Sequence, residues 1–514
     1  MRGDHVKGQS WTTVSDLLVY TACKYPGKTA LIYKGEEISY EQLLVKALRV
    51  ACWLKEKGLS PGFRAAILTD NPIEYLSAYF GSILAGGISV GLNIQTTPRA
   101  LSYFLQDTGA QAFMANKRFE ATLKQVLTKG TGAEIIALAS GEELTDILET
   151  GDSAELHLLP WRSSCDLAQI IYTSGTTGKP KGVCLRNRNL IANTMSIIEY
   201  LGIDSSDRVM AVLPFFYSYG NSIMLTHIAM GSTLVVNQNF VYPNKIVEDM
   251  LKYRVTAFSG VPSTYAILLK RSNISSYSFP DLRYITQAGA AMAPSMAQRL
   301  QKLFPETKIY IMYGQTEASA RLSYLPSEHL LHKPGSIGIP IPGVELRLLD
   351  EDGRPVPVGE VGEIVARGEN IMAGYWNAPD ATQKVLKPEG LRTGDLARMD
   401  QDGFLYIVSR KSDIIKSGSH RIAPKEIEDV AMELRGVSEA AVVGMPDPIL
   451  GESIWLFITL EHREGIDKKS VMRHLRRILP AYKVPHELRI VEDFPRTSTG
   501  KIQKNQLKQL TALN

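Results

Sequence analysis

Apolar residues along the chain follow two spacings, one typical of helices and one typical of buried strands. In the first 160 residues, three-to-four-residue spacing predicts helices over 41–57 and 72–85, and Thr97-Pro98 predicts the start of another helix. Short apolar runs predict strands here and again between 207 and 313. These predicted strands are 64–69, 87–91, 110–114, 208–213, 232–236, 255–258, 283–287 and 308–312. The alternation predicts an α/β fold with much parallel sheet, built as two stacked subdomains.

The pattern changes after residue 335. Gly and Pro turns multiply between 335 and 408, which predicts a small all-β subdomain. A polar run at 409–413 follows the strand predicted at 404–408, so we place a domain boundary there. The remaining residues carry their own pattern, with helices expected over 424–434 and 467–479 and strands over 438–444, 454–460 and 487–491. We therefore predict a large N-terminal domain, 1–411, and a small α+β C-terminal domain, 412–514.

Composition narrows the class of protein. The 514 residues carry 57 basic and 53 acidic side chains, a near balance that argues against nucleic acid as the main partner. Four scattered cysteines without a C-x-x-C pair predict reduced thiols and a cytoplasmic location. The polar start of the chain predicts no signal peptide. The most apolar window, 78–92, is short and broken by glycine, so we expect a core helix and a strand there and no membrane span.

The segment 172–182 has the composition of a polyphosphate-binding loop. It reads Tyr-Thr-Ser-Gly-Thr-Thr-Gly-Lys-Pro-Lys-Gly and lies between two predicted strands. Glycines let backbone N–H groups turn toward a bound anion, and hydroxyls and lysines add donors and charge. It is not a P-loop, because Pro180 follows Lys179 where that motif needs Ser or Thr. The candidate phosphate ligands are Thr173, Ser174, Gly175, Thr176, Thr177, Gly178, Lys179 and Lys181.

Further motifs follow in order along the chain. They are Pro-Phe-Phe-Tyr-Ser-Tyr-Gly at 214–220, Gln-Ala-Gly-Ala-Ala-Met at 287–292, Met-Tyr-Gly-Gln-Thr-Glu at 312–317, Leu-Arg-Thr-Gly-Asp at 391–395, and Pro-Arg-Thr-Ser-Thr-Gly-Lys-Ile at 495–502. Together with the phosphate loop, this set resembles the adenylate-forming superfamily of acyl-CoA synthetases, peptide-synthetase adenylation domains and firefly luciferase. The resemblance covers about residues 12 to 511.

The resemblance implies roles in binding ATP and Mg²⁺. Tyr313 stacks near the adenine, Thr316 touches phosphate, and Glu317 helps to hold Mg²⁺. Asp395 accepts hydrogen bonds from the ribose hydroxyls, and Arg410 touches ribose or phosphate. Lys501 reaches the carboxylate and the α-phosphate, because a cation must bridge two anions that react. Other residues implied at the nucleotide are Gln287, Gly289, Ala290, Gly314, Gln315 and Tyr406.

The resemblance also implies an acyl pocket, a tunnel for a thiol and a mobile C-terminal domain. Tyr217 gates the thiol, and the hinge falls at Ser412, where the family most often has Asp or Lys. The tunnel and pocket residues are Tyr217, Ser218, Gly260, Met292, Lys416 and Gly418, with Ser259, Gln287, Gly289 and Met312 nearby. All of these except Lys416 and Gly418, which belong to the thiol tunnel alone, are the pocket candidates, and their small, aromatic or apolar side chains predict an uncharged acyl or aryl tail. The segment 211–224 holds no acid, which disfavours α-amino acids because a buried ammonium needs a partner.

The chain is therefore predicted to be an ATP-dependent carboxylate ligase. The resemblance implies that a carboxylic acid and ATP form an acyl-adenylate and pyrophosphate, and that the thiol of coenzyme A then takes the acyl group. The alternative acceptor is the phosphopantetheine of an acyl or peptidyl carrier protein. A non-catalytic nucleotide-binding protein is disfavoured because binding alone needs no adenylation lysine. A luciferase-like oxygenase belongs to the same family, but no residue favours it.

Overall fold

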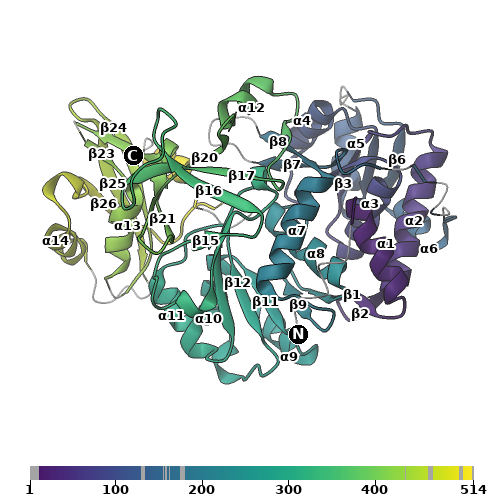
Figure 1. Cartoon of the computed structure of the whole chain (residues 1–514), viewed down its shortest axis with the longest axis horizontal. Coiled ribbons are helices and arrows are strands. Elements are labelled where there is room, and N and C mark those ends of the chain that lie inside the picture. The colour runs from purple at the N-terminus through teal and green to yellow at the C-terminus, as the bar shows by residue number, and fades with distance from the viewer. Residues whose placement is uncertain are drawn as a thin grey trace.

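The computed structural model of the chain describes residues 11–128, 133–153, 156, 159–160, 162–173, 180–418, 420–434, 436–460, 467–496 and 502–511. Figure 1 shows the N-terminal helices and strands at one end of the molecule and the C-terminal elements at the other. Within the described residues, the strands form four sheets. The α/β class predicted from the apolar pattern is confirmed.

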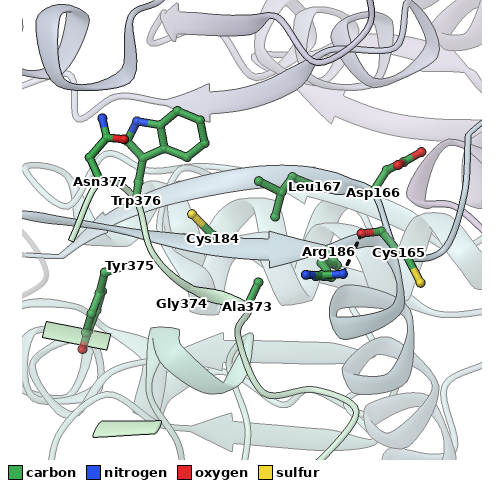
Figure 2. A pocket seen from close by; sticks show the side chains of 10 residues that line it. All are labelled: Cys165, Asp166, Leu167, Cys184, Arg186, Ala373, Gly374, Tyr375, Trp376 and Asn377. Atoms are coloured by element: carbon green, nitrogen blue, oxygen red, sulfur yellow. Dashed lines mark hydrogen bonds between the residues drawn. The ribbon is translucent and has the colours of Figure 1, made fainter. Parts of the chain in front are cut away.

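One sheet has the described strand order β18-β8-β7-β4-β3-β5-β6. Its strands are β3 (Arg64–Leu68), β4 (Ile88–Gly91), β5 (Ala112–Ala115), β6 (Ala137–Ser140), β7 (Leu167–Thr173), β8 (Lys181–Arg186) and β18 (Gly374–Tyr375). Five neighbouring strands of this sheet, β7, β4, β3, β5 and β6, are parallel to one another. Strand β8 is antiparallel to β7. The short strand β18 arrives from far along the chain and pairs with β8, so Tyr375 and Trp376 lie beside that strand (Figure 2).

The second sheet has the described order β15-β14-β13-β12-β11-β9-β10-β1-β2. Its strands are β1 (Thr29–Tyr33), β2 (Glu36–Ser39), β9 (Arg208–Ala211), β10 (Thr233–Val236), β11 (Ala257–Gly260), β12 (Tyr284–Gln287), β13 (Lys308–Tyr313), β14 (Ser323–Leu325) and β15 (Ile339–Pro340). The strands β9 to β13 confirm the prediction for 207–313. The pairing of β1 with β10 was not predicted, and it places N-terminal residues in the sheet of the second subdomain.

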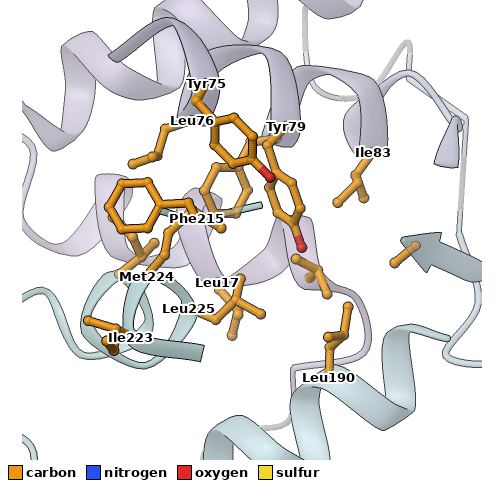
Figure 3. Packing of buried hydrophobic residues seen from close by; sticks show 14 of the residues in the cluster. Leu17, Tyr75, Leu76, Tyr79, Ile83, Leu190, Phe215, Ile223, Met224 and Leu225 are labelled. Atoms are coloured by element: carbon orange, nitrogen blue, oxygen red, sulfur yellow. The ribbon is translucent and has the colours of Figure 1, made fainter. Parts of the chain in front are cut away.

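Helices cover these two sheets. They are α1 (Val14–Lys24), α2 (Tyr40–Glu56), α3 (Pro72–Leu84), α4 (Pro98–Thr108), α5 (Glu120–Thr128), α6 (Glu142–Thr150), α7 (Asn187–Leu201), α8 (Ser218–Met230), α9 (Pro243–Lys252), α10 (Pro262–Arg271) and α11 (Pro294–Leu303). Six of them (α1, α2, α3, α6, α7 and α8) contribute to one apolar cluster. Figure 3 shows α3 packing Tyr75 and Tyr79 toward Phe215 and α8. The same apolar cluster includes Ile67 of β3 and Val209 of β9, so it joins both sheets. The two sheets are therefore held together by shared apolar packing.

The region 335–408 is a small β subdomain with one exception to the prediction. Its strands β16 (Val344–Leu349), β17 (Val361–Gly368), β19 (Leu386–Lys387), β20 (Gly390–Met399) and β21 (Leu405–Arg410) form the third sheet. The expectation that this region is all-β is wrong, because α12 (Pro379–Val385) lies within it. Proline at its first position favours that helix.

The last part of the chain has its own sheet and core. Its elements are β22 (Ile415–Ser417), β23 (His420–Ile422), α13 (Pro424–Met432), β24 (Val437–Asp447), β25 (Gly451–Leu460), α14 (Lys468–Ile478), β26 (Glu487–Ile490) and α15 (Lys504–Thr511). An apolar cluster that includes Ile427, Leu456 and Leu475 fills the space between the helices and the sheet. The predicted helices and strands are confirmed here, and the boundary at Ser412 stays a prediction. No helix in the described part of the chain is long and apolar enough to cross a membrane.

Candidate active site

The predicted nucleotide residues follow three parallel strands of the second sheet. Strands β11, β12 and β13 are in register, with Gly260 opposite Gln287 and Gln287 opposite Ile311. The carboxyl ends of parallel strands meet at one edge, where ligands of open α/β sheets bind. Gly260, Gln287 and Tyr313 therefore end at the same edge of the sheet.

Tyr313, Asp395 and Arg410 form one hydrogen-bonded cluster. The Tyr313 hydroxyl donates to Oδ2 of Asp395 at 2.7 Å, and Nε of Arg410 donates to Oδ1 at 2.9 Å. The Asp395 side chain is 5% exposed. Asp395 on β20 pairs with Arg410 on the neighbouring strand β21. Burial, with the nearby Asp395 charge, raises the pKa of Tyr313, so this hydroxyl stays a donor at neutral pH. The cluster thus brings together residues predicted at the adenine and at the ribose.

Thr316 and Glu317 lie beside this cluster in the short 3-10 helix η4 (Thr316–Ala318), directly after β13. The hydroxyl oxygens of Ser218 and Thr316 are 3.2 Å apart. Oε1 of Glu317 accepts a hydrogen bond from the Tyr375 hydroxyl at 2.8 Å, and its Oε2 accepts none from the described residues. One open carboxylate oxygen fits Mg²⁺ shared with phosphate. Within the described ranges, no three or more His, Cys, Asp or Glu side chains gather as a metal site.

Tyr375 is a site residue that the sequence analysis missed. Its hydroxyl holds Glu317, and the Nζ of Lys181 lies 4.9 Å from the centroid of its ring. Burial, with the nearby Glu317 charge, raises the pKa of Tyr375, so it remains a donor. The strand β18 was not predicted from the sequence. The signal that could have drawn attention to Tyr375 was the Gly-Tyr-Trp triplet at 374–376. Tyr375 connects the carboxylate predicted for Mg²⁺ with a lysine predicted for phosphate.

The two ends of the predicted phosphate loop are braced by α4. Thr173 and Lys181 pair across β7 and β8. The Tyr172 hydroxyl donates to Oδ2 of Asp107 at 2.5 Å, and the Tyr103 hydroxyl donates to the carbonyl oxygen of Pro180 at 3.0 Å. Tyr103 and Asp107 were not predicted as site residues. The rest of the predicted loop lies outside the described residues, namely Ser174, Gly175, Thr176, Thr177, Gly178 and Lys179.

Two predicted nucleotide residues carry buried polar atoms without partners in the described part of the chain. These atoms are Oε1 of Gln287 and Nε2 of Gln315. The other amide end of Gln287 donates to the carbonyl oxygen of Ala290 at 2.6 Å, which closes the loop after β12. Gly289 in that loop has φ +90°, a conformation that favours glycine. Buried polar atoms are normally bonded, so these two atoms fit a polar ligand.

The predicted acyl and tunnel residues lie at the start of α8, on or after strands β11 and β12 of the second sheet, and on or after β22 of the fourth sheet. The Tyr217 hydroxyl accepts a hydrogen bond from Nδ2 of Asn93 at 2.9 Å. Met292 is buried, and a Cβ on Gly260 would lie 2.8 Å from Cγ2 of Thr264. Lys416 is exposed on β22, and Gly418, with φ +59°, donates its N–H to the carbonyl oxygen of Leu450 at 2.8 Å.

Several predicted residues are not in contact with the Asp395 cluster. Tyr406 lies on β21, four positions before Arg410, and its hydroxyl donates a hydrogen bond to Asp400 at 3.1 Å. Ser412 lies in the 3-10 helix η6 (Lys411–Asp413), where its hydroxyl donates to Asp413 at 3.0 Å. Lys501 lies outside the described residues, although its neighbour Ile502 pairs with Arg496. The roles of Tyr406, Ser412 and Lys501 stay predictions.

A surface hollow of about 450 Å³ lies beside β8 and β18 (Figure 2). It is lined by Cys165, Asp166, Leu167, Cys184, Arg186, Ala373, Gly374, Tyr375, Trp376 and Asn377. None of the predicted site residues lines it, although Tyr375 does. The assembled polar groups around Asp395 and Glu317 are the better candidate site.

Two sequence families match consecutive parts of the chain. The AMP-binding enzyme family matches residues 19–376, and the AMP-binding enzyme C-terminal domain matches residues 426–501. The first range alone covers more than half of the chain. The first range contains the predicted site residues from Thr173 to Glu317, and the second contains Lys501.

Relatives match along nearly the whole chain. A long-chain-fatty-acid–CoA ligase of Salmonella typhimurium is 31% identical over 97% of this chain and 94% of its own length. A feruloyl-CoA synthase of Amycolatopsis is 31% identical over 94% of this chain and 96% of its own length. Among solved structures, ATP-bound MatB from Rhodopseudomonas palustris has a TM-score of 0.89 at 29% identity, covering 96% of this chain and 98% of that chain.

Proposed function

The chain belongs to the family of AMP-binding enzymes, and from that premise we propose that it is an ATP-dependent acyl-CoA synthetase. A carboxylate oxygen of the acid attacks the α-phosphorus of ATP, and the bond to pyrophosphate breaks. The thiolate sulfur of coenzyme A then attacks the acyl carbonyl, and AMP leaves. The product is a thioester, and the overall reaction is that of an AMP-forming acid–thiol ligase.

The observation that supports this proposal most is the cluster of Tyr313, Asp395 and Arg410 beside Thr316 and Glu317. An ionised carboxylate has about four acceptor positions, and the cluster uses two of those on Asp395. Two remain for the ribose hydroxyls. The unpartnered amide atoms of Gln287 and Gln315 add a donor and an acceptor nearby for the rest of the nucleotide. These free hydrogen-bonding positions support our assignment of the ribose and part of the nucleotide to this cluster.

Charge decides the first step, because an anionic acid must attack an anionic phosphate. Lys181 at the exit of the phosphate loop and Lys501 near the C-terminus are the lysines we assign to those charges. Mg²⁺ would be held by the open oxygen of Glu317, and it would neutralise phosphate charge. Tyr375 keeps the other oxygen of Glu317 fixed in position.

We also propose that the C-terminal region turns about Ser412 between the two steps. Lys501 serves the first step and Gly418 the second, yet both belong to the small region 412–514. A region with its own sheet and core can turn as a unit about a short connection such as η6. The scattered cysteines Cys23, Cys52, Cys165 and Cys184 are free thiols, which supports our proposal of a reducing, cytoplasmic setting.

The reaction can be tested with radiolabelled pyrophosphate exchange into ATP over fatty, aromatic, dicarboxylic and amino acids. We expect exchange that depends on one class of carboxylic acid, and mass detection of its CoA thioester when coenzyme A is added. No exchange with any acid would support a nucleotide-binding protein instead. Exchange without a CoA product, but with loading of a phosphopantetheine carrier, would assign the alternative acceptor.

Replacing Tyr375 by Phe should weaken the first step by about 10-fold, the lower end of the range for one hydrogen bond to a charged group. The ring beside Lys181 remains, whereas Glu317 loses its donor. We expect a higher Mg²⁺ concentration for half-maximal exchange. The exposed Tyr277→Phe is the matched control. An unchanged Mg²⁺ dependence in Tyr375→Phe would remove Tyr375 from the positioning of Glu317.

Replacing Gly418 by Leu should block thioester formation and spare pyrophosphate exchange. A leucine would fill the tunnel that we assign to the thiol. The positive φ of Gly418 strains any other residue, so Gly418→Ala is the control that carries the strain without the bulk. We expect the alanine variant to keep most of the thioester activity. Equal loss in both variants, or an intact second step in Gly418→Leu, would contradict the tunnel assignment.

A further inference from the structure

Arg321 carries a buried positive charge that has only neutral neighbours. The residue is 3% exposed and follows η4 by three positions. Its Nε lies 3.3 Å from Sδ of Met312, and its Nη1 lies 3.5 Å from the carbonyl oxygen of Ala320. Its guanidinium carbon lies 4.0 Å from the centroid of the Tyr219 ring. Among the described residues, no carboxylate forms an ion pair with it.

Other buried charges of this chain are paired. Asp207 is fully buried and bonds Arg283 at 2.7 Å, and Asp395 bonds Arg410 at 2.9 Å. The same holds for Glu363 with Arg392 and for Lys46 with Glu149. Burying a charge is costly unless a partner compensates it. Arg321 is therefore the exception in the part of the chain that the structure describes, and a ligand can supply the missing anion.

The guanidinium lines a small cavity between α7, α8 and the strands β11 to β13. The cavity has a volume of about 10 Å³, close to that of one water-sized group. The hydroxyls of Ser259 and Thr286, which are 2.8 Å apart, line it together with Tyr219 and Met312. Ser259 and Met312 are residues that the sequence analysis placed near the acyl pocket. A charged side chain thus lies next to two residues predicted for the acyl pocket.

Arg321 lies on the acyl side of the candidate active site. Tyr219, whose ring it covers, follows Ser218, and the Ser218 hydroxyl lies 3.2 Å from that of Thr316. The backbone of Arg321 packs behind Gly314, since a Cβ on Gly314 would lie 2.8 Å from the Arg321 Cα. Arg321 thus lies close in the fold to residues predicted for the acyl end of the site.

We propose that the acid activated by this chain is a dicarboxylic acid, and that Arg321 binds its second carboxylate. This inference rests on the proposed function, because it names the substrate class of the same site. Arginine suits the role, since its planar fork binds carboxylates through two donors and its charge does not titrate. Because the cavity has room for only about one water-sized group, the side chains around Arg321 must move apart to admit the carboxylate.

Pyrophosphate exchange with matched pairs of acids tests the proposal. Each pair differs only in a distal carboxylate or methyl group: succinate and butyrate, glutarate and valerate, terephthalate and 4-methylbenzoate. We expect the wild-type chain to prefer the diacid of at least one pair by at least about 30-fold in kcat/KM, the lower end for a buried charge pair. Arg321→Met should lose this preference or reverse it. Arg321→Lys, which keeps the charge without the fork, should lie between them.

Thermal unfolding separates recognition from a structural role. Arg321→Met removes an uncompensated charge at similar length, so we expect its Tm within about 2 °C of the wild type or above it. The exposed Arg208→Met is the matched control. A lowered Tm with equal loss for both members of every pair would assign Arg321 a structural role and overturn the inference.

The remaining outcomes are distinguishable. A wild-type preference for the methyl-ended acids, unchanged in Arg321→Met, would overturn the dicarboxylate proposal and leave the acyl-CoA synthetase standing. An absence of exchange with every acid tested would overturn the proposed function and this inference together.

Discussion

Lys501→Ala is expected to abolish acyl-adenylate formation while a supplied acyl-adenylate is still converted to the CoA thioester. The first step joins two anions, and removing one stabilising group of this kind costs roughly 10²–10³-fold in rate. The second step joins a thiolate to a neutral carbonyl and does not need that cation. Pyrophosphate exchange measures the first step, and thioester formation from a synthetic acyl-adenylate measures the second.

The neighbouring Lys504→Ala provides the control for this prediction. Lys504 begins α15 and pairs with Glu428 at 2.6 Å, so its charge is already engaged within the C-terminal region. We expect little change in either step for this variant. Equal loss of both steps in Lys501→Ala would refute the role that we assign to Lys501.

Asp395→Ala should lower kcat/KM for ATP by about 10²-fold or more. The change removes the carboxylate that holds Tyr313 and Arg410 and that we assign to the two ribose hydroxyls. Each lost hydrogen bond to this charged group is worth about 1.5–3 kcal/mol. The loss should appear mainly in the KM for ATP, with the acid and coenzyme A held at saturation. Dependence on the acid should change little.

Two further variants show whether charge or shape matters at this position. Asp395→Asn keeps the shape, and we expect it to be less damaging than Asp395→Ala. Asp207→Ala also removes a buried, paired carboxylate, at the far end of β9, and it should lower the Tm without raising the KM for ATP. If Asp207→Ala and Asp395→Ala raise that KM alike, general destabilisation would explain the result and the ribose role would be wrong.

Much of the fold was readable from local patterns. Predicted helices at 41–57 and 72–85 correspond to α2 and α3 within about one residue, because strong apolar spacing and caps such as Ser39 and Asn71 define their limits. The strands β9 to β13 are short apolar runs with clear turns between them. By contrast, β2 is half exposed, and β18 has only two residues, so neither gives a strong pattern.

Long-range pairing was the part that sequence could not provide. The Tyr313–Asp395 bond joins residues 82 positions apart on different sheets, and Glu317 meets Tyr375 across 58 positions. No local spacing encodes such contacts, because they depend on how the sheets pack. Motif resemblance located Asp395 and Glu317 singly. Tyr375, Tyr103 and Asp107 belong to no quoted motif, and only the folded chain places them at the site.

The uncharged pocket expected from the sequence illustrates the same limit. The residues considered there came from segments near the known motifs, and all were neutral. Arg321 lies only four positions after Glu317, but its sequence context does not reveal that its charge is buried without an acid. The sequence gives the type of each residue, but the free-energy cost of a charged residue depends on its burial and on its partners in the folded chain.

The pairing of β1 with β10 has a consequence for how the chain is made. Thr29 and Thr233 are 204 positions apart, yet the hydroxyl of Thr233 donates to the carbonyl oxygen of Thr29 at 2.7 Å. A ribosome adding roughly 5–20 residues per second needs about 10–40 s to span that interval. For that time the nascent N-terminal hairpin has an unsatisfied β edge. Until β10 is synthesised, this edge can pair with other chains, which is a route to aggregation.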